Sequence, residues 1–544
     1  MSSNNKTTST IEEAKPALLP KLRFPEFRHA SSWTTVKLGA VATISTQKAG
    51  NSICVPMSIT TGVGLVSQEE KFGRVIAGES YKNYLLLKPN DFAYNKSATK
   101  EYPEGFLTLY TGNELAAVPN SIFTCFRING DSPDVRFLNY QFSDNLHGRW
   151  LRKFIQVGAR ANGSLSINDS DLMALPVPLP VGATSVVEQQ KIADCLSSLD
   201  ELITAQARKV DALKTHKKGL MQQLFPREGE TQPRLRFPDF QNAGKWEGKT
   251  LNDIAKITSG STPSRSNPEF FTGGSIPWVK TTDLNNSFIV ETEEKITSKA
   301  KARINPAGSV LIAMYGGFNQ IGRTGCLSNS AATNQAISVL VLDRKAAVPA
   351  YVLAWLNAKV EVWRRIASSS RKDPNITGSD VAKFSIVLPE LDEQQRIASC
   401  LSSLDDVITA ETQQLEALKT LKKGLMQQLH PARHRGHAIL PSRCIPRRTA
   451  IGGGSRYWQA LYLSFQRPAQ HHGKNRILLW PYRYFLLPQG AEHRRCGALQ
   501  PCLEPAQPWQ ISTYKICRLT QNVKNEVLKI KQFFTFCGNE VGLS

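Results

Sequence analysis

The chain has 544 residues, of which 41% are hydrophobic, 8% aromatic and 21% charged; this is typical of a globular protein and too long for one core. Its formal net charge of +22 points to a polyanionic partner, although residues 432–544 carry +13 of it, with seventeen Lys or Arg, four Glu and no Asp. No apolar run approaches the ~18–20 residues that span a bilayer, and the cysteines lack CxxC spacing, so we expect a cytoplasmic protein with no membrane partner.

The first part of the chain is predicted to hold a short lead-in and a globular domain. Residues 1–19 lack the basic-then-apolar pattern of a signal peptide and are interpreted as disordered, and the domain is placed at 20–187. It opens with KLRFPEF at 21–27, and the segment 137–155 is predicted to be helical. Basic, aromatic and amide side chains on its predicted loops are the candidate ligand contacts: Tyr94, Asn95, Lys96, Arg160 and Asn162.

A long repeat then organises the chain. EQQKIADCLSSLDELITAQARKVDALKTHKKGLMQQLFP at 188–226 returns at 393–431 as EQQRIASCLSSLDDVITAETQQLEALKTLKKGLMQQLHP, with 27 of 39 positions identical at an offset of 205. The opener also returns, as RLRFPDF at 234–240, whereas the stretches between these marks share little. The sequence therefore predicts a duplicated module whose globular parts perform different versions of one task.

Both copies of the repeat are predicted to be helical. Apolar residues recur at spacings of three and four, Ser185 with Glu188 predicts a capping box, and Pro226 and Pro431 end the helices, which makes rods of roughly 50–55 Å. Either the two rods pair, antiparallel if the domains lie at opposite ends, or each rod completes the core of its own domain; the length of the stripe favours pairing. The predicted interface consists of Ile192, Leu196, Leu199, Ile203, Leu213, Leu220, Ile397, Leu401, Leu404, Ile408, Leu418 and Leu425.

The second domain is placed at 231–392, between the helical regions 188–230 and 393–431. Stretches such as GSIPWVKTTDL, GSVLIAMYGG and AISVLVLD predict short strands, and 351–367 predicts a helix. The fold class is thus α+β: two similar mixed α/β domains separated by two long helices that form an antiparallel coiled coil. The candidate ligand contacts in this domain are Trp278, Lys280, Thr281, Thr282, Asp283, Tyr315, Asn319, Arg371 and Lys372. For any single one of them, a solvated loop side chain is an equally good interpretation. Arg160 and Arg371 are the stronger ones because their loops are positional twins.

Motifs for catalysis are missing from the sequence. GKWEGKT at 244–250 is one residue short of a P-loop, and its repeat partner SSWTTVK has no glycine, so we interpret it as a turn into a strand. No methyltransferase tetrad, nuclease motif or zinc-ligand spacing is present. We therefore expect neither catalytic residues nor a metal site in this chain.

The repeated EQQ-x-IA-x-CLSSLD…KKGLMQQL helix, the LRFP[ED]F opener and IPWVKTTDL resemble the specificity (S) subunit of type I restriction–modification systems, over roughly residues 20–431. The resemblance implies two target recognition domains that each read half of a split sequence in double-stranded DNA, on a coiled coil that sets their spacing. It also implies docking to two methyltransferase (M) subunits and to restriction/translocase (R) subunits. S-adenosylmethionine, ATP and Mg would then belong to those partners, with no cofactor in this chain.

Two other functions stay open: a non-catalytic coiled-coil adapter that binds proteins through its variable domains, and a self-sufficient DNA methyltransferase, which the missing motifs disfavour. The tail at 432–544 departs from the family pattern and holds five of the ten cysteines. We favour a frameshift or read-through product, or otherwise disordered chain, over an appended basic DNA-binding arm.

Overall fold

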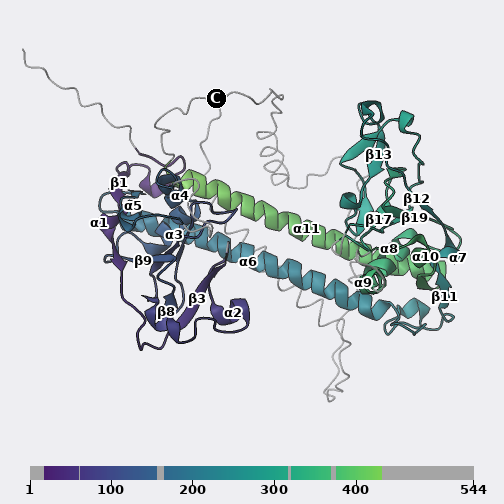
Figure 1. The fold of residues 1–544 in the computed structure, drawn as a ribbon, viewed down its shortest axis with the longest axis horizontal. Coiled ribbons are helices and arrows are strands. Elements are labelled where there is room, and N and C mark those ends of the chain that lie inside the picture. The colour runs from purple at the N-terminus through teal and green to yellow at the C-terminus, as the bar shows by residue number, and fades with distance from the viewer. Residues whose placement is uncertain (1–17, 61, 156–164, 317–319, 369–374, 432–544) are drawn as a thin grey trace, which may run out of the picture. The chain divides into compact units, whose positions relative to one another are not determined.

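The computed structural model describes residues 18–60, 62–155, 165–316, 320–368 and 375–431, which form a mixed α/β protein (Figure 1). The mixed α/β class predicted from the sequence is confirmed, whereas the tail at 432–544 lies outside the described residues. Among the described helices, none combines the length and the apolar character needed to cross a bilayer.

The first domain is built on two four-stranded sheets and a small strand pair. The sheet order β2-β9-β6-β7 joins Ala42–Ser45, Phe123–Ile128, Phe92–Asn95 and Phe106–Leu109, and the order β4-β3-β8-β5 joins Gly64–Ser67, Val55–Thr60, Ala116–Val118 and Leu85–Leu87. Strand β1 (Thr34–Lys37) pairs antiparallel with β10 (Pro176–Leu179). The helices are α1 (Leu38–Val41), α2 (Gln68–Phe72), α3 (Val135–Ser143), α4 (Leu146–Leu151) and α5 (Asp169–Met173), with 3-10 turns η1 (Pro25–Phe27) and η2 (Gly78–Asn83).

The second domain has sheets of five and three strands and the same kind of strand pair. The order β12-β19-β16-β17-β14 joins Ala255–Ser259, Ile337–Leu342, Val310–Ala313, Thr324–Leu327 and Ser287–Ile289, and β15-β13-β18 joins Glu294–Ile296, Ile276–Val279 and Ala332–Thr333. Strand β11 (Glu247–Thr250) pairs with β20 (Ser385–Leu388). The helices are α7 (Leu251–Ile254), α8 (Pro349–Ala358), α9 (Val360–Ser368) and α10 (Gly378–Ala382), with 3-10 turns η3 (Pro238–Phe240), η4 (Pro268–Phe270), η5 (Thr281–Asp283) and η6 (Ser298–Ala300).

The two domains share one strand order even where their sequences share little. The order β12-β19-β16-β17 reproduces β2-β9-β6-β7, and the parallel pair β13–β18 reproduces the parallel pair β3–β8. The strands expected in GSIPWVKTTDL, GSVLIAMYGG and AISVLVLD are confirmed as β13, β16 and β19, and the GKT of 244–250 does enter strand β11. The duplication therefore includes the globular parts as well as the helices.

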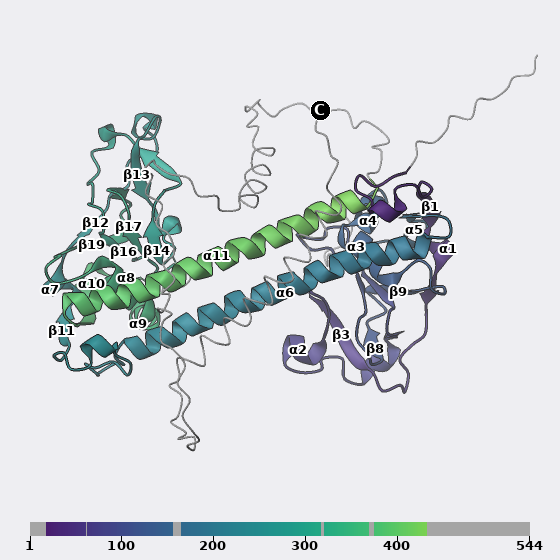
Figure 2. The same cartoon turned by 180° about the vertical axis from the view of Figure 1, so that it is seen from behind.

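Two long helices, α6 (Ser185–Leu224, 40 residues) and α11 (Leu391–Leu429, 39 residues), lie side by side (Figures 1 and 2). Cross-contacts join Lys217 to Asp405, Lys209 to Glu411 and Asp200 to Lys422, so residue numbers rise along one helix as they fall along the other. Where they touch, the helices thus run in opposite directions.

Each long helix begins in one hydrophobic core and ends in the other. The first-domain core holds Ile192, Leu196 and Leu199 of α6 together with Leu425 and Leu429 of α11. The second-domain core holds Ile397 and Leu401 of α11 together with Leu224 of α6, with Leu220 packed against it. The two arrangements left open by the sequence thus occur together, because the predicted stripe serves both the domain cores and the contact between helices.

One detail of the helix prediction, the capping box, was wrong, and one buried position was missed. Thr184, not Ser185, precedes the first turn of α6, and Glu188 is no capping residue because Arg23 binds its carboxylate. In the middle of α6 the buried positions are Leu202, Gln206, Val210 and Leu213, while Ile203 is half-buried, as are Leu404 and Ile408 of α11. Leu202 is therefore buried where Ile203 was predicted, and the stripe continues through Gln206 as the apolar spacing predicts.

Candidate functional site

Buried carboxylates fix both openers to the long helices. Arg23 donates from Nε and Nη2 to the two carboxylate oxygens of Glu188, at 2.7 Å each, and Arg236 repeats the arrangement on Glu393 at 2.8 and 2.7 Å. Both glutamates are 1% exposed. Two parallel charge-assisted bonds define direction as well as distance, so each opener is held to its helix in one orientation.

The glutamine after each glutamate holds the domain helix. Gln189 accepts a hydrogen bond from the backbone N–H of Asp134, just before α3, and Gln394 accepts one from Val348, just before α8, at 2.9 Å each. Gln394 also donates to the carbonyls of Ala346 and Pro389. The repeated EQQ motif is therefore a joint between each domain and its helix.

The lysine of KKGLMQQL crosses to the other helix. Lys217 of α6 binds Asp405 of α11, and Lys422, its repeat equivalent, binds Asp200, the equivalent of Asp405, both at 2.5 Å. Lys422 also lies over the ring of Tyr140, whose hydroxyl donates to the Asp200 carboxylate. The two ion pairs are reciprocal, which is what a two-fold relation between the repeats requires.

The structure gives two of the first domain's candidate contacts a structural role. Tyr94 is fully buried and its hydroxyl donates to the carbonyl of Glu104 at 2.7 Å, and Asn95 is 5% exposed and accepts from the backbone of Ser97. A buried side chain does not reach a ligand in this conformation, so as contact residues these two predictions were wrong. Lys96 is half-buried and paired with Asp169 at 3.2 Å, and a contact from it stays a prediction.

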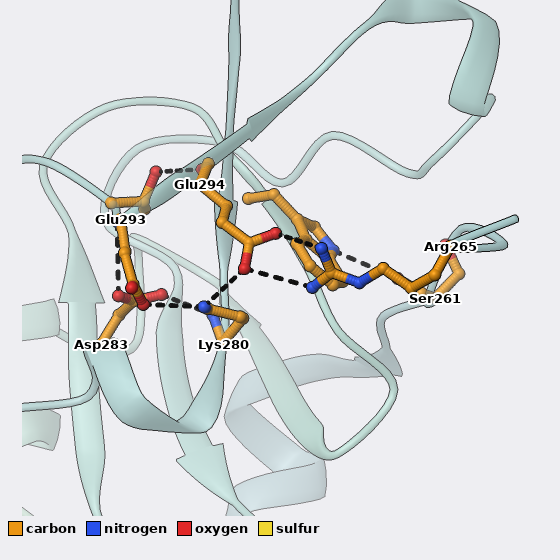
Figure 3. A network of polar contacts seen from close by, with 8 residues as sticks. Ser261, Arg265, Lys280, Asp283, Glu293 and Glu294 are labelled. Atoms are coloured by element: carbon orange, nitrogen blue, oxygen red, sulfur yellow. Dashed lines mark hydrogen bonds and ion pairs between the residues drawn. The ribbon is translucent and has the colours of Figure 1, made fainter. Parts of the chain in front are cut away.

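In the second domain, IPWVKTTDL lies in a polar network that also includes Ser261, Arg265, Glu293 and Glu294 (Figure 3). Trp278 is 2% exposed and donates to the carbonyl of Ser261, so it supports the fold and its assignment as a contact was wrong. Lys280 binds Glu293 at 2.8 Å and Glu294 at 2.7 Å, so these two carboxylates balance the positive charge of its ammonium group.

The rest of this segment forms the turn η5. Asp283 is half-buried and accepts a hydrogen bond from the backbone of Lys280 at 2.7 Å, which closes the turn, and a contact from Asp283 stays a prediction. Thr281 is half-buried, while Thr282 and Tyr315 are exposed. These three residues stay predicted contacts, and Arg160, Asn162, Asn319, Arg371 and Lys372 lie outside the described residues.

Arg265 is a member of this network that sequence reasoning missed. Its guanidinium binds both carboxylate oxygens of Glu294 and lies 4.6 Å from the ring centroid of Phe271 and 5.3 Å from that of Trp278. Arg265, followed by Lys280, lowers the pKa of Glu294 to about 2. The only available signal was an arginine in a Ser- and Pro-rich loop, and its acidic partner lies 29 residues further along the chain.

A cavity of about 980 Å³ at the end of α6 gathers unpaired positive charge. Its wall includes Lys214, Lys218, Arg227 and Arg234, which are exposed and whose side chains form no hydrogen bond or ion pair with another described residue. Lys359 also lines the cavity and donates to the carbonyl of Pro226, and burial lowers its pKa. Such a wall favours a polyanionic ligand.

Residues with metal-binding chemistry do not cluster in the described ranges: no group of three or more His, Cys, Asp or Glu side chains there could hold an ion. The described residues define the class of the protein, a tandem duplication of one mixed α/β module in which each copy carries a long repeated helix.

Comparison with known proteins identifies the domain family of one part of the chain. Residues 243–420 match the type I restriction modification DNA specificity domain. The chain is 32% identical to the type I restriction enzyme MjaIX specificity subunit of Methanocaldococcus jannaschii over 32% of this chain and 41% of that one. It is 26% identical to the EcoR124I/EcoR124II specificity subunit of Escherichia coli over 32% of this chain and 44% of that one. Residues 243–420 thus belong to this domain family, and the resemblance to type I specificity subunits is confirmed, although the alignments span less than half of these two relatives.

Among solved structures, a type I restriction–modification S subunit from M. genitalium aligns with 77% of this chain and 100% of its own, at 13% identity and a TM-score of 0.47. A structure described as showing complex assembly and conformational transition of the type I R-M system aligns with 73% of this chain and 97% of its own, at 16% identity and a TM-score of 0.47.

Proposed function

We propose that this chain is the DNA sequence-specificity subunit of a type I restriction–modification complex. Each domain reads one half of a bipartite target in double-stranded DNA, and α6 and α11 act as an antiparallel coiled coil that holds the two readers at a fixed separation. The chain is non-catalytic; methyltransferase and restriction subunits dock onto it, and S-adenosylmethionine, ATP and Mg serve those subunits.

The observation that carries this proposal is the reciprocal pair of ion bridges, Lys217–Asp405 and Lys422–Asp200. They support a two-fold relation between two modules with the same strand order. A duplex has the same symmetry, so a two-fold protein matches two half-sites separated by a set number of base pairs. The unpaired cations of the α6 cavity suit the phosphate contacts that provide most of the affinity for DNA.

The test is to express the full chain with the methyltransferase subunit of its own system in a host that lacks DNA modification. Single-molecule methylome sequencing should find one bipartite motif with a fixed gap. Replacing residues 20–187 with the corresponding domain of another such subunit should change one half of the motif and leave the other half and the gap unaltered. Binding to proteins without any methylated motif would favour an adapter, and a contiguous motif would contradict the two-reader arrangement.

A further inference from the structure

A buried polar cluster interrupts the apolar seam between α6 and α11. Gln206 is fully buried, and its Nε2 donates to Glu411 Oε2 at 2.7 Å and to the Glu411 carbonyl at 2.9 Å. Lys209 binds Glu411 Oε1 at 2.6 Å, and the side chains of this ion pair are 9% and 16% exposed. The cluster is therefore shielded from water on both helices.

The cluster lies where the two repeats meet their own equivalents. Gln206 and Glu411 are 205 positions apart, which is the offset of the repeat, so they are the same repeat position in contact with itself. The reciprocal bridges Lys217–Asp405 and Lys422–Asp200 lie on either side of this contact along the helices. Gln206 and Glu411 thus mark the pseudo-two-fold axis of the helix pair.

The repeats differ most at this axis. Twelve of the 39 repeat positions differ, and six of them are the consecutive positions 206–211 in α6 and 411–416 in α11. Away from the axis, Lys217 and Asp200 occur in both copies as Lys422 and Asp405. An α6–α6 pair or an α11–α11 pair between two molecules could therefore form the same bridges on its flanks, and the centre is the longest block of residues that distinguishes it from the observed pair.

We propose that Gln206, Lys209 and Glu411 select the pairing of α6 with α11 over the pairing of either helix with its own copy in a second molecule. An α6–α6 pair brings two Lys209 side chains to the axis without a carboxylate. An α11–α11 pair brings two Glu411 side chains there, with Gln414 at the position equivalent to Lys209 and therefore no cation. Each like pair buries two equal charges without a partner, which is strongly unfavourable.

A polar contact at one seam position is a known means of fixing which helices pair, at some cost in stability. This inference does not depend on the proposed function, because it concerns only the two helices. Two molecules that exchange their α11 helices still form α6–α11 pairs with the same cluster, so the cluster does not disfavour that exchange. The amount of chain that pairs between molecules in the wild type is therefore the level with which the variants are compared.

Three variants of the full chain test the selection. For each variant we would measure the thermal midpoint of unfolding and the molecular mass by light scattering. We would also measure how much untagged chain is recovered together with a tagged copy, which reports pairing between two molecules. Gln206→Glu/Lys209→Gln gives α6 the charges of α11 and should lower the thermal midpoint. Adding Glu411→Gln and Gln414→Lys exchanges the two halves of the cluster and should restore most of the midpoint and the wild-type mass.

The third variant, Gln206→Leu/Lys209→Gln/Glu411→Leu, makes the axis apolar. It should unfold at a higher temperature than the wild type. The amount of untagged chain recovered with the tagged copy should nevertheless rise by roughly tenfold, which corresponds to a loss of about 1.4 kcal/mol in the preference for α6–α11 pairing. A four-residue exchange that fails to restore the first variant would overturn the proposal. So would an apolar axis that leaves the recovery of untagged chain at the wild-type level.

Discussion

The guanidinium of Arg23 binds the carboxylate of Glu188 through two bonds of 2.7 Å, although 165 residues separate them in the chain. Trp33 adds a third bond, from Nε1 to Glu188 at 3.2 Å. The second module repeats the ion pair as Arg236 and Glu393. One joint is thus used twice to attach a domain to a rod.

Arg23→Ala should destabilise the first domain by about 3 kcal/mol, because it leaves the buried Glu188 carboxylate without its cation. Arg136→Ala is the matched control: the Arg136 side chain is 47% exposed in its pairs with Asp194 at 2.8 Å and Asp134 at 3.7 Å, so its loss should change stability by less than about 1 kcal/mol. Thermal unfolding followed by circular dichroism measures both. Equal losses in the two variants would mean that burial of the joint contributes nothing.

The repeated glutamine gives a second prediction, on neighbouring residues of one helix. Gln394→Leu removes the partners of three backbone groups, at Val348, Ala346 and Pro389, and should cost the second domain about 2 kcal/mol or more. Gln395→Leu should be nearly neutral because that side chain is exposed and, among the described residues, bonds only to Ser399. Urea unfolding of the two variants gives the comparison, and similar midpoints would refute the role assigned to Gln394.

The repeats and their helices could be predicted from the sequence because the identity between the copies and the spacing of apolar residues are both visible in continuous stretches of the chain. The joints could not: Arg23 and Glu188 were both visible, but nothing local says that they meet. Residue type alone also did not distinguish ligand-contacting residues from core residues. A Tyr or Trp next to a basic residue is found in both places, and Tyr94 and Trp278 are buried. The charge of Lys280 is cancelled by Glu293 and Glu294, whose approach depends on the pairing of β13 with β15.

Acid should weaken the second domain through Glu294. Its pKa is lowered to about 2, first by Arg265 and then by Lys280, so its ionised form stabilises the folded state above the ordinary value of 4.5. That contribution is lost as the pH falls from about 4.5 toward 2. Arg265→Met should raise the pKa of Glu294 and shift acid unfolding to a higher pH. Titration of the Glu294 carboxyl by NMR tests this directly, and an unchanged pKa in the variant would contradict the assignment of Arg265 as its main partner.

The basic cavity should contribute to DNA affinity without affecting sequence choice. Lys218→Gln/Arg234→Gln removes two unpaired cations, so binding of the complex should weaken on all sequences alike. The slope of log K against log salt should fall by up to about two, at roughly 0.9 for each phosphate contact. Lys299→Gln is the control, because Lys299 is exposed outside the cavity and paired with Glu269. A changed half-site in the methylome would instead place these residues among the base contacts.

Helix length should set the gap between the half-sites. One additional heptad inserted after Leu213 in α6 and another after Val407 in α11 lie at facing positions, so the pair is lengthened and the observed bridges are kept. Seven residues add about 10 Å of rise, and at about 3.4 Å per base-pair step the gap should grow by up to about three base pairs. The half-sites should not change, because neither domain is altered. The same heptad in α6 alone shifts Lys217 away from Asp405 and should abolish methylation by misaligning the seam. Methylome sequencing that finds new half-sites with the original gap would rule out the helices as the spacer.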